Sequence, residues 1–150
     1  MDMKIARSSL LILLGFLGLG AIGGGGVFII SPSGKLIGMP LSLLDKSPFT
    51  DFMIPGIILF IVLGLIPCGL VVALLKRPVS KWADRFNFFP DMYWAWTGSI
   101  YVAFALIIWI QIQMVFLQAV DWLHTVYMFL AIAILFVALL PTVRSVYKNK

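Results

Sequence analysis

The polar side chains best suited to chemistry lie where the third apolar segment of the chain ends and the fourth begins. Gln111 and Gln118 are seven residues apart and share one face of a helix, whereas Gln113 points nearly the opposite way. Asp121 and His124 follow directly. Polar groups gathered beneath an apolar loop are typical of a small binding site. The candidate ligand-binding residues are Gln111, Gln118, Asp121 and His124, with Asp51 and Lys46 from a long connection that precedes the second apolar segment.

The same residues also fit a structural role. Asp121 stands where a fourth helix would begin and can cap it, and His124 has the position from which a capping-box side chain reaches back. The glutamines can hydrogen-bond between helices, because an amide left unsatisfied in lipid is costly. Both interpretations stay open at the level of the sequence.

Several kinds of catalytic or metal site are disfavoured. Cys68 is the only cysteine, so no intramolecular disulfide can form. It is expected near the cytoplasmic end of its segment and His124 near the outer end, which separates a Cys–His pair by most of the bilayer. One histidine and no glutamate argue against zinc, and the glycine run lacks the Lys-Ser/Thr of a phosphate-binding loop. We expect no catalytic residues, no metal and no cofactor.

The composition predicts a membrane protein. Hydrophobic residues make up 62% of the 150 positions and charged residues 11%, against roughly 45–50% and about 25% in soluble domains. Apolar runs of about 20 residues, the length that crosses a bilayer, cover residues 9–30, 52–75, 96–117 and 122–143. The first run exceeds the apolar core of a secretory signal, so we expect an uncleaved anchor. Residues 1–150 are predicted to form a single transmembrane domain.

The basic residues predict the orientation of these spans. Of eleven Lys and Arg, only Lys35 and Lys46 fall between the first and second spans. The other nine precede the first span, separate the second from the third, or follow the fourth. Cytoplasmic segments carry such an excess, so both termini are predicted to be cytoplasmic and the protein multi-pass in the inner (cytoplasmic) membrane. The same pattern explains the net charge of +5 without a nucleic-acid partner.

Glycines are concentrated in the first span. In lipid, small residues let helices approach closely, which offsets the low helix propensity of glycine. At about 100° per residue they fall on two faces, so the first helix is expected to lie between neighbours. Pro67 should kink the second helix. The predicted helix-packing residues are Gly15, Gly18, Gly20, Gly24, Gly25 and, in the second span, Gly64.

Two connections have patterns of their own. Residues 31–56 are rich in proline and glycine but also in leucine, and are expected to fold back onto the outer helix ends. Val79, Trp82, Phe86 and Phe89 recur at helical spacing, which predicts a short interfacial helix. The predicted fold is an all-α, antiparallel four-helix transmembrane bundle with both termini inside, a long extracytoplasmic loop between helices 1 and 2, and this interfacial helix between helices 2 and 3.

The loop and the spans that follow it resemble a group of small bacterial four-span integral membrane proteins. The resemblance is carried by Pro48, Phe49, Asp51, Phe52, Pro55 and Gly56, then by I-I-L-F-I-V-L-G-L and W-I-Q-I-Q. It covers nearly the whole chain and implies a membrane location and a fold, but no activity. A more remote likeness to DoxX-type four-helix proteins rests on size and topology.

The sequence favours a non-enzymatic function. We expect a structural or accessory component of a membrane assembly, in contact with the lipid bilayer and with another membrane protein or further copies of itself. The alternative is a small-molecule or lipid-binding protein, an enzyme or oligomeric transporter among them, that uses a polar pocket under the extracytoplasmic loop.

Overall fold

The computed structural model describes residues 2–149 and is helical throughout its long elements. Four helices are long and apolar enough to span a membrane: Met3–Ile30, Met53–Lys76, Trp94–Leu117 and Trp122–Leu139. The first is α1, the third α5 and the fourth α6. The second is a continuous run of three parts, α2 (Met53–Ile58), the π-helical η3 (Leu59–Leu65) and α3 (Ile66–Lys76).

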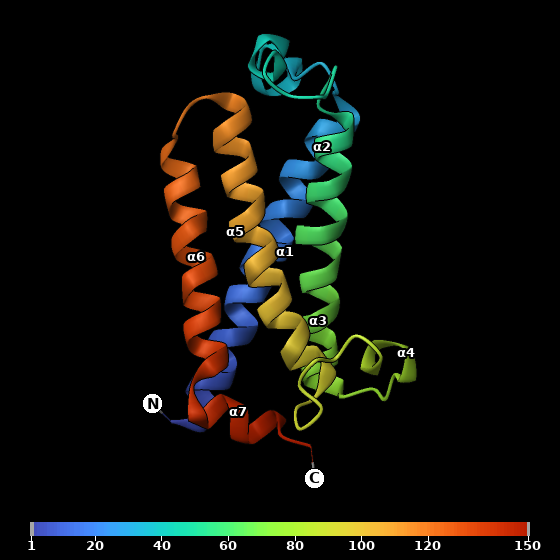
Figure 1. The fold of residues 1–150 in the computed structure, drawn as a ribbon, viewed down its shortest axis with the longest axis vertical. Coiled ribbons are helices and arrows are strands. Elements are labelled where there is room, and N and C mark those ends of the chain that lie inside the picture. The colour runs from blue at the N-terminus through green and yellow to red at the C-terminus, as the bar shows by residue number, and fades with distance from the viewer. Residues whose placement is uncertain (1, 150) are drawn as a thin grey trace.

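Short elements lie at the two ends of these helices (Figure 1). The 3₁₀ turns η1 (Lys35–Ile37) and η2 (Leu41–Leu44) belong to the segment between α1 and α2, at the same end as the connection from α5 to α6. At the other end lie α4 (Lys81–Asp84), α7 (Pro141–Tyr147) and both ends of the chain. The helix expected around Trp82 is therefore a single turn, after which the chain continues without helix to Trp94.

Two prolines shape the helices that contain them. Pro67 has no N–H to donate to the carbonyl of Leu63, and the helix adopts π-helical spacing over Leu59–Leu65, just before it. The fourth span ends at Leu139, short of the predicted residue 143, because Leu140 takes an extended conformation (φ −55°, ψ 134°) ahead of Pro141. A residue before proline is disfavoured in the α region, so a separate helix, α7, starts at Pro141.

α1 contacts α2, η3 and α3 along one side and α6 along another, and its first turns contact α7. The contact with the second span is made through glycines. A Cβ placed on Gly18 would lie 2.5 Å from Cys68 Sγ, and one placed on Gly64 would lie 3.1 Å from the Ile22 nitrogen. No side chain fits there, so the two helix backbones lie close together.

The six predicted packing glycines are not equivalent. Gly18, Gly25 and Gly64 lie in the tight contact between α1 and the second span. Gly20 faces α6, where an added Cβ would lie 2.9 Å from the Tyr127 hydroxyl. A Cβ on Gly24 would make an ordinary contact of 3.5 Å with Leu59, and a Cβ on Gly15 would meet no atom of another helix within 4 Å among the described residues.

Candidate functional site

Asp121 and His124 form a capping box at the start of α6. Asp121 Oδ1 accepts a hydrogen bond from the Leu123 N–H at 2.9 Å, and the Asp121 N–H donates to His124 Nδ1 at 3.0 Å. His124 is 7% exposed. Two backbone donors that the first turn of a helix leaves unsatisfied are thereby paired.

The other candidate residues make local bonds or none. Gln118 ends α5 in the left-handed conformation (φ 51°), and its Nε2 donates to the Val115 carbonyl of the same helix at 2.6 Å. Asp51 Oδ1 accepts from the Met53 N–H at 2.9 Å, beside the start of α2. Gln111 and Lys46 are exposed, and no hydrogen bond of either side chain is found within residues 2–149. Within residues 2–149, the Asp121–His124 pair is the only hydrogen-bonded pair among the six candidate residues.

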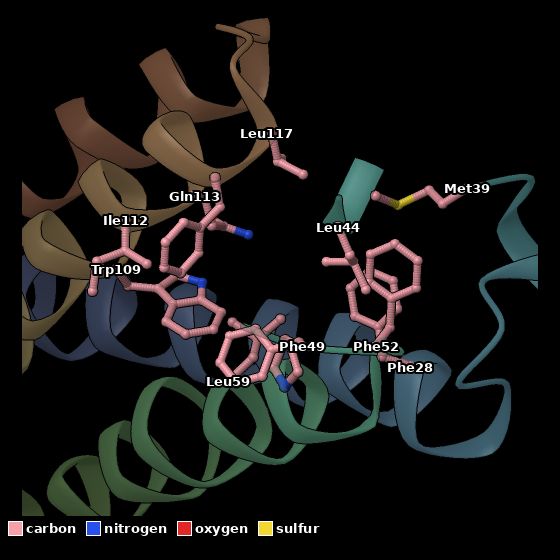
Figure 2. Close-up of a pocket in the computed structure, with 12 residues that line it drawn as sticks. Phe28, Met39, Leu44, Phe49, Phe52, Leu59, Trp109, Ile112, Gln113 and Leu117 are labelled. Atoms are coloured by element: carbon pink, nitrogen blue, oxygen red, sulfur yellow. The ribbon is translucent and has the colours of Figure 1, made fainter. Parts of the chain in front are cut away.

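A pocket does lie under the segment between α1 and α2, but other residues line it (Figure 2). It has a volume of about 60 Å³ and is bounded by α1, the covering segment, the start of the second span and the C-terminal part of α5. Its polar groups are the Gln113 amide and the Trp109 indole, among apolar side chains. The main lining residues are Phe28, Leu44, Phe49, Phe52, Leu59, Trp109, Gln113 and Phe116.

Aromatic contacts hold the covering segment over this pocket. The ring of Phe52 stacks on that of Phe28 from α1 with centroids 4.9 Å apart, and Phe49 meets Phe116 of α5 edge to face at 6.3 Å. The Phe52 N–H also donates to the Pro32 carbonyl at 2.9 Å. Leu44 and Phe52 are buried by this packing, whereas Leu36, Ile37 and Leu41 of the same segment stay exposed.

Gln113, which the sequence places nearly opposite Gln111 and outside the candidate set, is the glutamine that lines this pocket. Its half-buried amide points into the space between α5 and the covering segment (Figure 2). Trp109, Gln113 and Phe116 are spaced four and three residues apart, so they share a helix face. That spacing was the signal available in the sequence. An apolar pocket with an amide fits an apolar molecule that carries a single hydrogen-bonding group.

The described residues were also compared with the requirements of a metal site, and the chain with known proteins. Within residues 2–149, no three or more His, Cys, Asp or Glu side chains are grouped so as to hold a metal ion. No protein-family model, curated protein or solved structure matches this chain.

Proposed function

We propose that this chain is a multi-pass protein of the bacterial cytoplasmic membrane that acts as a non-catalytic component of a membrane assembly, with both termini in the cytoplasm. The distribution of cations supports the orientation. Lys4, Arg7, Arg77, Arg144 and Lys148 belong to segments at the end of the bundle where the chain begins and finishes (Figure 1). Lys35 and Lys46 belong to the opposite end. Cytoplasmic ends of spans carry such an excess of Lys and Arg.

The exposed amide of Gln111 is the main support for a role in a membrane assembly. It lies on an exposed stripe of α5 with Phe104 and Val115, which are each 53% exposed, and Ile108, which is 58% exposed. Lipid offers the amide no hydrogen-bond partner, and none is found for it within residues 2–149. A neighbouring transmembrane helix that supplies a donor or acceptor would satisfy it.

The bonds of the other polar candidates support a non-catalytic role. The Asp121 carboxylate and the His124 Nδ1 atom are engaged in capping α6. The Gln118 amide is bonded to its own helix, and Asp51 accepts from the backbone two residues later. Each of these hydrogen bonds stabilises a turn or a helix end, which supports a structural role for these side chains.

Site-specific photo-crosslinking in native membranes tests the proposal. A photoactivatable residue at Ile108, one turn from Gln111, should give a discrete crosslinked protein product. The matched control is the same photoactivatable residue at Phe136, which is 65% exposed on α6.

A second test measures the assembly in detergent. Gln111→Leu should weaken the assembly about five-fold, in line with about 1 kcal/mol for an interhelical hydrogen bond, and Gln111→Asn should retain more of it. Lipid adducts alone from Ile108, or equal protein products from both positions, would contradict the proposal.

The pocket favours a second candidate function, the binding of an apolar small molecule or lipid chain. Its lining is apolar apart from Gln113 and Trp109, and it lies at one end of the spans. A photoactivatable fatty acid should label the lining residues in preference to the lipid-facing stripes. Leu117→Trp, which fills the pocket, should suppress that labelling, whereas Ile132→Trp on α6 should not. Labelling spread evenly over all exposed apolar positions would exclude a specific site.

A further inference from the structure

A second hollow lies at the end of the bundle that carries both chain termini. This groove of about 460 Å³ is lined by residues that follow α3, by Tyr93 just before α5, and by residues in and just after α7. Its lining includes two cations, Arg77 and Lys148, together with the polar side chains of Tyr93, Ser145 and Asn149. No Asp or Glu is among its lining residues.

The walls of this groove are held together by hydrogen bonds between distant parts of the chain. The Tyr93 N–H donates to the Tyr147 carbonyl at 2.7 Å, and the Asn149 N–H donates to the Asp91 carbonyl at 2.9 Å. Asn149 Nδ2 also donates to the Met92 carbonyl at 2.9 Å. The buried Tyr147 side chain joins α7 to α1, since Arg7 Nε donates to its hydroxyl at 3.2 Å. The groove is therefore built in the folded chain and needs no ligand to form.

The cations of the groove keep unused donors. The guanidinium of Arg77 lies 5.1 Å over the centre of the Tyr147 ring, and one of its nitrogens donates to the Val146 carbonyl at 2.7 Å. A guanidinium has five N–H donors, so several remain to be directed at a ligand. Lys148 is exposed, and its ammonium group makes no hydrogen bond within residues 2–149.

Tyr93 adds a neutral hydroxyl to this basic surface. Burial raises the pKa of the Tyr93 hydroxyl above its ordinary value, while the nearby charge of Arg77 opposes the rise. The hydroxyl donates to the Pro78 carbonyl at 2.8 Å. The charge of Asp84 also raises this pKa, although Asp84 does not line the groove. A protonated tyrosine adds no negative charge, so the charged side chains that line the groove are the two cations.

We propose that this groove binds a phosphate group, and that Arg77 and Lys148 are its cationic ligands. Planar guanidinium donors and a mobile ammonium are the usual protein partners of phosphate oxygens. Basic pockets between transmembrane helices on the cytoplasmic side bind anionic lipid head groups. Val79 in the groove wall is 89% exposed, and Trp82 just beyond it is 72% exposed. Tryptophan favours the membrane–water interface, where lipid phosphates lie.

Lipid titration monitored by native mass spectrometry tests the site on the full-length protein in detergent. Phosphatidylglycerol should bind more tightly than phosphatidylcholine, whose phosphate is balanced by its own cation. Lys148→Ala should weaken binding of phosphatidylglycerol about five-fold, as expected for one Lys near an anionic lipid surface. Lys148→Arg should retain it. Lys148 is the better position to change, because Arg77 also holds α7 through Val146.

The control is Lys46→Ala, which removes the same charge from an exposed position at the opposite end of the bundle. It should leave binding of phosphatidylglycerol unchanged. Inorganic phosphate that competes with the lipid and depends equally on Lys148 would identify a soluble phosphate as the source and uphold the phosphate chemistry. Equal losses in Lys148→Ala and Lys46→Ala, no loss in Lys148→Ala, or equal affinity for both lipids would overturn the proposal.

Discussion

Gly25 of α1 and Gly56 of α2 lie backbone to backbone. A Cβ on Gly25 would lie 2.7 Å from the Gly56 carbonyl oxygen, and one on Gly56 would lie 3.1 Å from the Gly25 carbonyl oxygen. Lipid tails are as apolar as helix side chains, so there is no hydrophobic driving force for helices to associate in a membrane. Association depends instead on packing and hydrogen bonds. Such a contact therefore contributes directly to the stability of the bundle.

We expect Gly25→Ala to destabilise the protein by about 1–3 kcal/mol, because the added methyl group forces the helices apart. Thermal unfolding in a mild detergent measures the effect. Gly15→Ala is the matched control, since a Cβ at Gly15 meets no atom within 4 Å in residues 2–149. That variant should be neutral or stabilised by up to about 1 kcal/mol through better helix propensity. Similar destabilisation by both variants would argue against close packing at Gly25.

Trp96 joins α5 to the end of α6. Its indole Nε1–H donates to the Ala138 carbonyl at 2.8 Å, and both residues are buried. A carbonyl in the last turn of a helix has no partner within that helix, and Pro141 brings no N–H to this end.

Trp96→Phe should therefore lower the free energy of unfolding by about 1–3 kcal/mol, the cost of leaving a buried acceptor unpaired. Denaturant titration in detergent, followed by circular dichroism, gives the value. Trp122→Phe, at a residue 70% exposed, should change stability little. A loss for Trp96→Phe no larger than for this control would show that the indole hydrogen bond is dispensable.

The capping box at Asp121 and His124 should matter for the first turn of α6 more than for the whole bundle. Asp121→Ala should cost about 1 kcal/mol, the usual effect of losing an N-cap, and Asp121→Asn should largely restore it. Hydrogen exchange of the amides after Trp122 measures this local opening. Unchanged exchange in Asp121→Ala would mean that α6 begins independently of its cap.

Phe52 anchors the segment that covers the pocket. Phe52→Ala removes the stacked contact with Phe28 and leaves a space beneath the segment. Loss of a fully packed phenylalanine ring lowers the free energy of unfolding by about 3–5 kcal/mol. Trypsin cleavage after Lys35 and Lys46 should then become much faster, because proteolysis follows local opening. Leu36→Ala, at a side chain 63% exposed, is the control and should not accelerate cleavage. Equal cleavage rates in both variants would show that Phe52 does not hold the covering segment in place.

Hydropathy was sufficient to predict four helices long and apolar enough to span a membrane, because span length is a local property of the chain. The hydrogen bonds of Asp121 and His124 were foreseeable for the same reason, as a capping box needs only residues three apart. Pro141 also marked a boundary, although the prediction carried the fourth span past it.

Only the tertiary structure decided which helix faces meet. Periodicity placed Gln113 opposite Gln111, but it could not say which of the two faces the covering segment. It likewise predicted Gly15 as a packing residue together with Gly18 and Gly25, although a Cβ on Gly15 would meet no atom within 4 Å among the described residues. A repeat of 3.6 residues defines faces relative to one helix axis, whereas contact depends on where the other helices lie. The positions of the other helices depend on the whole chain and not on any one segment.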